Sequence, residues 1–197
     1  MHRLCLSLAA AAAVVLVSAP AAFAARVHVR VEGKTQTIFG ATEPAVAADT
    51  VLGALEAASA RGEFYYHVTQ FSFGAYVDQV GRYAAAGAGG WGYKVDGAVV
   101  PAASDSIRLE DGARVVWYWT TFAETGGPPT LRLIRQPRGC YRVLAQDDEG
   151  RATAALGATL QVDGRRVRTR AGRACIGPHR GLVRAVRAGS VRSNAVR

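Results

Sequence analysis

Apolar and polar side chains alternate along short stretches of the first half of the chain. Val27, Val29 and Val31 alternate with polar neighbours, which is the period-two pattern of a half-buried strand. Later stretches are rich in β-branched and aromatic residues and predict further strands; they span residues 35–39, 64–68, 75–80, 91–95 and 114–121. The first half is therefore expected to be mainly β-sheet.

One stretch of this half has the periodicity of a helix. Its apolar side chains fall on one face of a helix over residues 50–61; they are Val51, Leu52, Leu55 and Ala58. Asp49 is expected to cap the start of this helix, and Gly62 to end it. Two strands, a helix and several more strands predict an α+β fold with one helix on a mixed sheet, which is the arrangement of a β-grasp domain.

The second half of the chain predicts strands only. Apolar side chains alternate with polar ones over residues 141–145, 160–162 and 167–169. Asp163-Gly164 separates the last two runs and is a hairpin-turn pair, because both residues tolerate positive φ. Three further runs complete the set, over residues 171–176, 182–188 and 191–196. Residues 131–197 are therefore expected to form a small all-β, sandwich-like domain.

A linker and a change of charge separate the two halves. Residues 124–130 read Glu-Thr-Gly-Gly-Pro-Pro-Thr, a composition that ends strands and cannot continue a helix. Residues 25–130 carry eight Lys or Arg and eleven Asp or Glu, whereas residues 131–197 carry fifteen Arg and four acids. We expect two domains, over residues 25–123 and 131–197.

The first residues are typical of a secretory signal peptide over residues 1–24. A basic start with Arg3 precedes an apolar run over residues 4–17, and small residues surround Ala22-Phe23-Ala24. Cleavage is expected after Ala24, and an uncleaved N-terminal anchor is the alternative. The mature protein would then be secreted or extracellular, or associated with the cell surface, without a transmembrane anchor. We expect it to be a monomer.

Loss of the signal peptide would remove Cys5 and leave two cysteines, Cys140 and Cys175. A pair of cysteines in a protein sent to an oxidising compartment predicts a disulfide. Closing a loop of that length would stabilise the fold by roughly 3–4 kcal/mol. Two free, reactive thiols are the alternative.

Four segments of the first half carry a family resemblance. They are Thr50-Val51-Leu52-Gly53-Ala54-Leu55-Glu56-Ala57-Ala58, Phe73-Gly74-Ala75-Tyr76-Val77, Gly90-Trp91-Gly92-Tyr93-Lys94-Val95-Asp96-Gly97 and Leu109-Glu110-Asp111-Gly112-Ala113-Arg114-Val115-Val116-Trp117-Tyr118-Trp119. In order and spacing they resemble the transcobalamin C-terminal-like family, which includes many secreted bacterial members of unknown function. The resemblance covers residues 26–122 and implies a β-grasp core in a module that binds a small ligand or a partner.

The resemblance does not extend to cobalamin itself. Animal cobalamin carriers hold their cofactor between this domain and a large helical domain, and these residues contain no segment long and helical enough to form one. Cobalamin or another small molecule is therefore an alternative ligand only. The second half has a looser likeness, on residues 162–166 and 169–174, to carboxypeptidase regulatory-like β-sandwich modules.

No set of residues in the sequence predicts a catalytic or a metal site. The sequence has no Gly-x-Ser-x-Gly elbow and no Cys-His arrangement suited to nucleophilic attack. The histidines beyond the signal peptide are scattered without metal-ligand spacing; they are His28, His67 and His179. We therefore expect no enzyme, no metal site and no cofactor.

Aromatic residues form the best candidate for a binding surface. Trp117 and Trp119 point to one side of their predicted strand, and Trp91 and Tyr93 share one side of theirs. Only one face of the sheet can pack on the single helix, so one set of side chains must look outward. If Trp91 and Tyr93 join the aromatic stripe that is exposed, the rings form a platform for a flat or sugar-like ligand. The alternative is that the second domain covers this stripe. The partner would be an unknown small molecule, a glycan or a component of the cell envelope.

The fifteen arginines of the second half raise the question of a polyanionic partner. Few aromatic residues lie between them to stack on bases, so nucleic acid is not expected. A solvated face and a contact with anionic wall polymer both remain open. The leading hypothesis is a secreted, non-enzymatic binding or interaction module; a structural cell-envelope protein that contacts wall polymer through its arginines is the first alternative.

Overall fold

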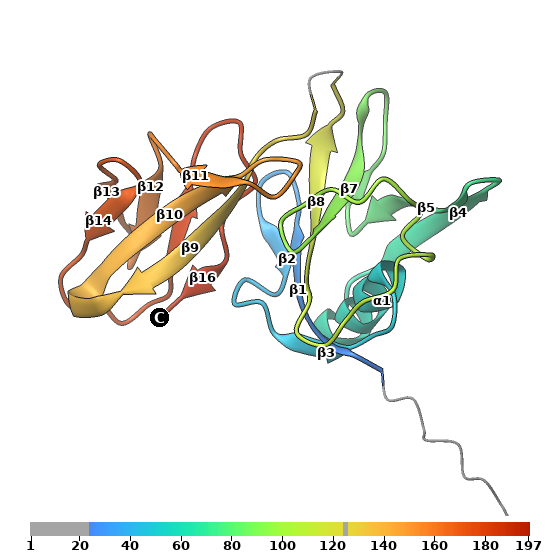
Figure 1. Cartoon of the computed structure of the whole chain (residues 1–197), viewed down its shortest axis with the longest axis horizontal. Helices are drawn as coiled ribbons and strands as arrows, with labels where there is room; N and C mark the ends of the chain where they lie inside the picture. The colour runs from blue at the N-terminus through green and yellow to red at the C-terminus, as the bar shows by residue number, and fades with distance from the viewer. Residues whose placement is uncertain (1–23, 124–125) are drawn as a thin grey trace, which may run out of the picture.

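The computed structural model describes residues 24–123 and 126–197 (Figure 1), so the predicted signal peptide, apart from Ala24, and the linker residues Glu124 and Thr125 lie outside the described residues. The first region, residues 24–123, contains eight strands and one α-helix. They are β1 (Arg26–Glu32), β2 (Thr37–Phe39), β3 (Ala45–Ala47), α1 (Val51–Gly62), β4 (Tyr66–Phe71), β5 (Gly74–Val80), β6 (Tyr83–Ala84), β7 (Gly89–Val95) and β8 (Arg114–Thr121).

The main sheet of the first region is mixed. Its order is β2-β1-β8-β7, and β3 pairs with β1. β1 and β8 run parallel, whereas the other neighbours are antiparallel. A separate three-stranded sheet, β4-β5-β6, stands beside β7, and the Trp91 indole ties the two sheets by donating to the Tyr83 carbonyl at 2.8 Å.

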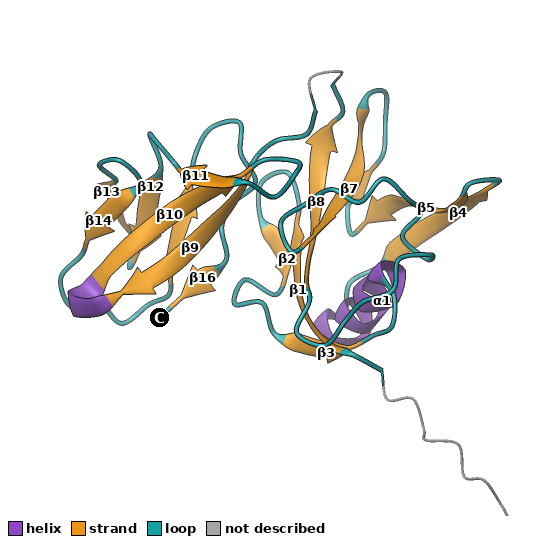
Figure 2. Cartoon of the chain, in the orientation of Figure 1, coloured by secondary structure: helices purple, strands orange, loops and turns teal. Residues whose placement is uncertain are grey.

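Helix α1 packs on one face of the main sheet (Figure 2). Its buried side chains meet those of β1 in one apolar cluster; the helical members are Val51, Ala54, Leu55 and Ala58. The helix begins one residue later than expected, because Thr50 rather than Asp49 is the cap: its hydroxyl accepts from the Gly53 N–H at 3.0 Å. Glu63, in the left-handed conformation, ends it.

The second region, residues 126–197, is built of strands and one 3₁₀ turn. They are β9 (Thr130–Gln136), η1 (Pro137–Gly139), β10 (Cys140–Gln146), β11 (Ala152–Ala154), β12 (Thr159–Val162), β13 (Arg165–Arg168), β14 (Arg173–Cys175), β15 (Val183–Val186) and β16 (Ala195–Val196). Two four-stranded antiparallel sheets result, one of β9, β10, β11 and β14 and one in the order β13-β12-β15-β16. Their inward side chains form a single buried cluster that includes Leu133, Val143 and Leu160.

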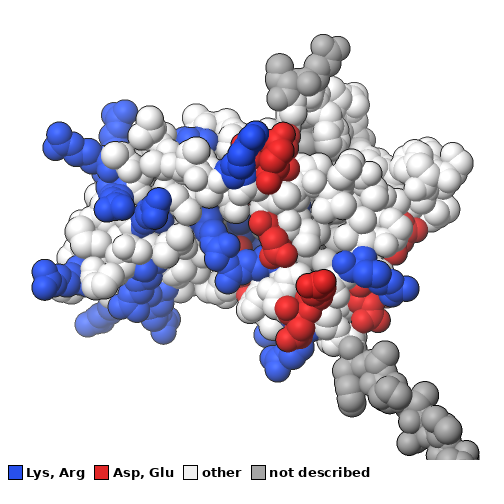
Figure 3. Space-filling view, in the orientation of Figure 1, with Lys and Arg blue, Asp and Glu red and all other residues white. Residues whose placement is uncertain are grey.

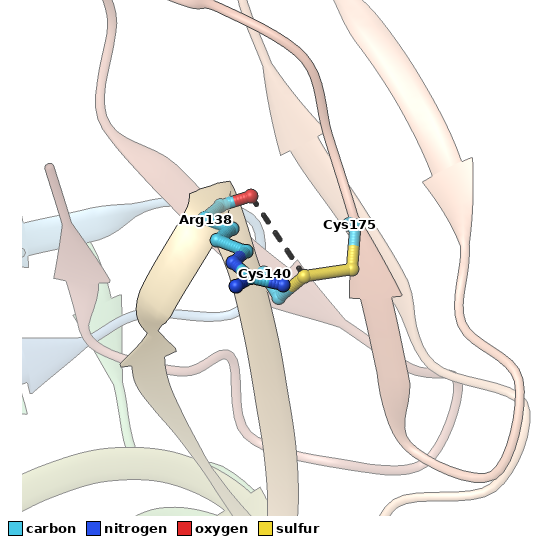
Figure 4. Close-up of a disulfide and its surroundings, with 3 residues drawn as sticks. All are labelled: Arg138, Cys140 and Cys175. Atoms are coloured by element: carbon cyan, nitrogen blue, oxygen red, sulfur yellow. Dashed lines mark hydrogen bonds between the residues drawn. A yellow bond between two sulfur atoms is a disulfide. The ribbon is translucent and has the colours of Figure 1, made fainter.

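The predicted disulfide is confirmed (Figure 4). Cys140 and Cys175 are directly opposed on the antiparallel strands β10 and β14, with their Cα atoms 3.8 Å apart. The predicted hairpin at Asp163-Gly164 is also confirmed, because both residues have positive φ, 47° and 73°, between β12 and β13. Strand β9 was not predicted, although Leu131 and Leu133 alternate with arginine in it.

Buried charges join the two regions. The Glu32 carboxylate, which is 1% exposed, accepts from Arg192 Nε at 2.9 Å, from Arg30 at 3.3 Å and from Arg184. Arg184 and Arg192 belong to the second region. The Glu32 carboxylate of the first region therefore forms ion pairs that hold the two regions together. The polar face of β1 is therefore buried as well, and the expectation of a half-buried strand was wrong for Arg30 and Glu32.

A second contact between the regions uses Lys94. Its ammonium group is fully buried, donates to the Asp147 carbonyl at 2.8 Å and lies 3.0 Å from Asp148 Oδ1. Between the two contacts, Val116 and Tyr118 on β8 pack against Val191. The second region thus covers the face of the main sheet that lies opposite α1.

The broad prediction is confirmed: over the described residues the chain is mainly β-strand, with one α-helix and several sheets. The position of the helix and of most strands agrees with the sequence pattern to within a few residues. No helix within residues 24–123 or 126–197 combines the length and apolar character needed to cross a bilayer.

Candidate functional site

The four aromatic residues singled out in the sequence lie on one face of the main sheet. In the antiparallel register of β7 and β8, Trp91 is opposite Trp119 and Tyr93 is opposite Trp117. The ring centroids are 5.9 Å apart in the first pair and 5.1 Å apart in the second. This face is the one that carries α1, whereas the second region covers the opposite face. The second region therefore does not cover the four rings, but the expectation of an exposed platform was also wrong, because Trp91 and Trp117 are 3% and 2% exposed and belong to the apolar cluster beneath α1.

Three of these four residues line one cavity of about 480 Å³, which we call the aromatic pocket. The walls also include β5 and the loop that precedes β8. The lining residues that define it are Phe73, Tyr76, Trp91, Tyr93, Ser104 and Trp117. Trp119 lies outside this pocket, where the ammonium group of Lys34 is 4.1 Å from the centre of its ring.

Two residues that line the aromatic pocket each have a buried polar atom without a hydrogen-bond partner among the described residues: Trp117 Nε1 and Ser104 Oγ. Each of these residues is only 2% exposed. A buried donor without a partner costs about 1–3 kcal/mol, and native structures contain few such atoms. Trp91, in contrast, has its indole N–H satisfied by the Tyr83 carbonyl. Of the two tryptophans that line the pocket, Trp117 therefore has an unsatisfied indole N–H and Trp91 does not.

Tyrosine hydroxyls shape the pocket without carrying charge at neutral pH. Burial, and then the nearby Asp105 carboxylate, raises the pKa of Tyr93, and its hydroxyl donates to the Ala102 carbonyl. Burial, and then Asp78, likewise raises the pKa of Tyr76. Both phenols therefore stay protonated, and Tyr93 fixes the loop of residues 101–106 against the sheet.

Gly90 explains one part of the Gly-Trp-Gly-Tyr motif. A Cβ atom at this position would lie 2.5 Å from the Tyr76 hydroxyl and 3.0 Å from the Phe122 ring. Because no real Cβ makes a contact as short as the first, any side chain here would displace Tyr76 from its place on the sheet. The glycine therefore gives β5 close access to β7, which closes that side of the pocket.

Several lining residues were not identified from the sequence. Ser104 reaches the pocket from a loop without apolar periodicity, so no local pattern pointed to it. Tyr76 lies in a predicted strand, but the sequence did not show that this strand borders the site. Phe73, at the tip of the β4–β5 hairpin, is 67% exposed and stacks on Phe71 with a centroid distance of 5.2 Å. The family-resemblance segment that begins at Phe73 was the sequence signal for this hairpin, whereas the exposure of the ring beside a cavity is seen only in the structure.

The histidines of the described residues do not come together at one site. No group of three or more His, Cys, Asp or Glu side chains that could hold a metal ion occurs in residues 24–123 and 126–197. His28 contacts the Glu43 carbonyl, His67 contacts Asp78, and His179 contacts the Tyr141 hydroxyl. Each histidine is thus accounted for by a local contact.

A family model matches part of the first region. The family described as "Domain of unknown function (DUF4430)", one of the transcobalamin-like domains, matches residues 48–121, which run from just before α1 to the end of β8. No curated protein matches the chain. The crystal structure of a candidate metal-binding protein from Ruminococcus gnavus is similar over 50% of this chain and 99% of its own, with 17% identity and a TM-score of 0.39. The matched family segment thus contains both strands of the aromatic stripe.

Proposed function

We propose that this chain is an exported, non-enzymatic binding module and that the aromatic pocket is its ligand site. One observation carries the proposal: a cavity of about 480 Å³ has aromatic walls, and two of its lining residues, Trp117 and Ser104, each have a buried donor without a hydrogen-bond partner among the described residues. Its volume lies within the usual range for small-molecule sites, about 300–1,000 Å³.

The walls of the pocket favour an uncharged ligand with a ring. No side chain that lines it carries a formal charge, so an ion would lose hydration without gaining a partner. Trp91, Tyr93 and Trp117 make the wall of the pocket largely aromatic, although Trp91 and Trp117 are mostly buried, and such a wall suits an aromatic ring or the apolar face of a sugar. Because Trp117 Nε1 is buried, a ligand acceptor would satisfy it only if the side chains that cover it moved aside, which would then remove the cost of the unsatisfied indole N–H.

The proposal also includes a β-grasp fold for the first region and export of the chain. One helix on a mixed sheet, together with the family match over residues 48–121, supports a β-grasp architecture for the first region. The Cys140–Cys175 disulfide supports export, because such bonds persist in oxidising compartments. The corrinoid alternative has no comparable support, because a corrin ring with its side chains needs more room than this pocket offers.

A ligand search with matched tryptophan variants tests the proposal. Purified protein would be incubated with mixtures of uncharged glycans and aromatic small molecules, and retained compounds identified by mass spectrometry. Trp117→Phe keeps an aromatic ring but removes the donor, so it should weaken binding about tenfold. Ser104→Ala should act in the same direction.

Trp119→Phe is the control, because Trp119 belongs to the same stripe but lies outside the pocket. It should leave the dissociation constant unchanged. Retention of no compound, or equal losses in the two tryptophan variants, would reject the pocket as the ligand site. A retained compound that is recovered chemically altered would instead indicate an enzyme.

A further inference from the structure

A second cavity lies where the two regions meet, away from the aromatic pocket. Its volume is about 490 Å³, and it lies between the β1–β2 turn of the first region and the strands β12, β13 and β15 of the second. We call it the basic cleft. Its charged lining residues are all cationic: Lys34, Arg166, Arg187 and Arg192.

Three of these four cations are not neutralised by the protein. Arg192 is paired with the buried Glu32 carboxylate. Among the described residues, no carboxylate forms an ion pair with Lys34, Arg166 or Arg187. Arg187 is held by a neutral partner, because its Nε donates to the Ser190 hydroxyl at 2.8 Å. The cleft therefore gathers three uncompensated positive charges.

The fold explains why these charges face the cleft. Leu160 is buried in the core of the second region, so its neighbour Gln161 and the cross-strand partner Arg166 face outward. Lys34 reaches the cleft from the first region, and its ammonium group rests over the Trp119 ring. Figure 3 shows the same division at larger scale, with Lys and Arg gathered over the second region and most acids over the first.

We propose that the basic cleft binds the phosphate or sulfate groups of a polyanion that carries no nucleic-acid bases. Guanidinium groups bind such oxyanions through two parallel hydrogen bonds. Hydroxyl groups supply further donors in the cleft; they are Thr35, Thr159 and Ser190. None of the residues that line it is aromatic, and the Lys34 ammonium group already lies over the neighbouring Trp119 ring, so bases would find little surface on which to stack.

This inference is independent of the aromatic pocket. The two cavities share no lining residue, so either site could fail without the other. The basic cleft also needs both regions in place, because Lys34 comes from one and the arginines from the other. It is therefore a property of the whole chain and not of the region that matches the family.

Binding of inorganic polyphosphate to the full chain tests the proposal. The cleft variant carries Lys34→Gln, Arg166→Gln and Arg187→Gln, and it should weaken binding at least about tenfold. It should also lower the slope of log affinity against log salt by about two to three, one for each lost contact. The control variant has the same change in net charge at three exposed positions that do not line the cleft. It carries Arg142→Gln, Arg170→Gln and Arg173→Gln.

Each outcome decides between the possibilities. Loss of affinity in the cleft variant alone supports the proposal, and a parallel titration with a sulfated oligosaccharide shows which oxyanion the cleft prefers. Equal losses in both variants would mean that total charge and not the cleft governs binding, which overturns it. Absence of polyphosphate binding overturns it as well. Tighter binding of a single-stranded oligonucleotide with equal charge would replace it with a nucleic-acid site.

Discussion

The cores of the two regions are made of different types of side chain. Every tryptophan and phenylalanine of the described residues lies in the first region, whereas Tyr141 is the one aromatic residue of the second. The first region uses large rings to fill the space between its sheets and its helix. The second fills its core chiefly with leucine, valine and alanine and adds the disulfide between β10 and β14. Small side chains bury little area each, so a covalent link has more to contribute there.

The difference extends to charge and explains how the regions fit together. The first region supplies a buried acid, Glu32, and the second supplies the arginines that surround it. Two other arginines of the second region, Arg166 and Arg187, lie in the basic cleft without an acid beside them. The arginines of the second region thus hold the two regions together and, as proposed, bind a polyanion.

The strongest way to break this complementarity is to remove its central acid. Glu32→Gln would leave Arg30, Arg184 and Arg192 crowded without their shared carboxylate. Loss of one partner from a buried ion pair typically costs about 3–5 kcal/mol, so the free energy of unfolding should fall by that amount in urea titrations. Glu56→Gln, an exposed acid on α1, removes the same charge and should change stability by less than about 0.5 kcal/mol. Similar losses in both variants would contradict a specific role for Glu32.

Removal of the disulfide should separate the stabilities of the two regions. A variant with Cys140→Ala and Cys175→Ala opens a loop with a sequence separation of 35 residues, and we expect a loss of about 3–4 kcal/mol. Hydrogen exchange should accelerate in β10 and β14, while tryptophan fluorescence, which reports only on the first region, should respond less. Unchanged exchange in these strands would show that the second region does not depend on its covalent link.

The sequence predicted structural features that depend mainly on local patterns and residue types. Strand β8 has the predicted bounds, residues 114–121, because its aromatic and β-branched residues are continuous. The turn at Asp163-Gly164 and the disulfide followed from residue types whose geometry is restricted. Strand β9 was missed because its alternation begins directly after a proline- and glycine-rich stretch that was read as a linker.

The sequence could not predict what depends on contacts between distant residues. Arg30 and Glu32 look solvent-facing in their strand, yet they are buried because Arg184 and Arg192 reach them from more than 150 residues away. The aromatic stripe was foreseen from strand periodicity, but the cavity beside it was not. Ser104 belongs to a loop whose position is set by a hydrogen bond to Tyr93 and not by any repeating pattern.

High pH offers a graded test of the interface between the regions. Burial, and then the Asp148 carboxylate, raises the pKa of Tyr118 from 10.0 to about 12. The unfolded chain therefore loses this proton first, so stability should fall as pH rises from about 10 to 12, by about 2–3 kcal/mol. Tyr118→Phe has no proton to lose and should reduce this fall, as measured by urea unfolding at a series of pH values. An identical pH dependence in the variant would place the titration elsewhere.

Loss of the contact between Lys94 and Asp148 should give the smallest change in stability, and this change should depend on pH in the acidic range. Burial alone would raise the pKa of Asp148, but the N–H of Gly127 and the ammonium of Lys94 outweigh it, so the pKa is lowered below 3.8. The carboxylate therefore stabilises the fold above pH 3.8, and this contribution is lost as pH falls through the lower, folded-state pKa. Asp148→Asn should cost about 1 kcal/mol near neutral pH, and the difference from the unchanged chain should vanish in acid. Glu149→Gln, in the same loop but 65% exposed, should show no such pH-dependent difference, since water already screens its charge.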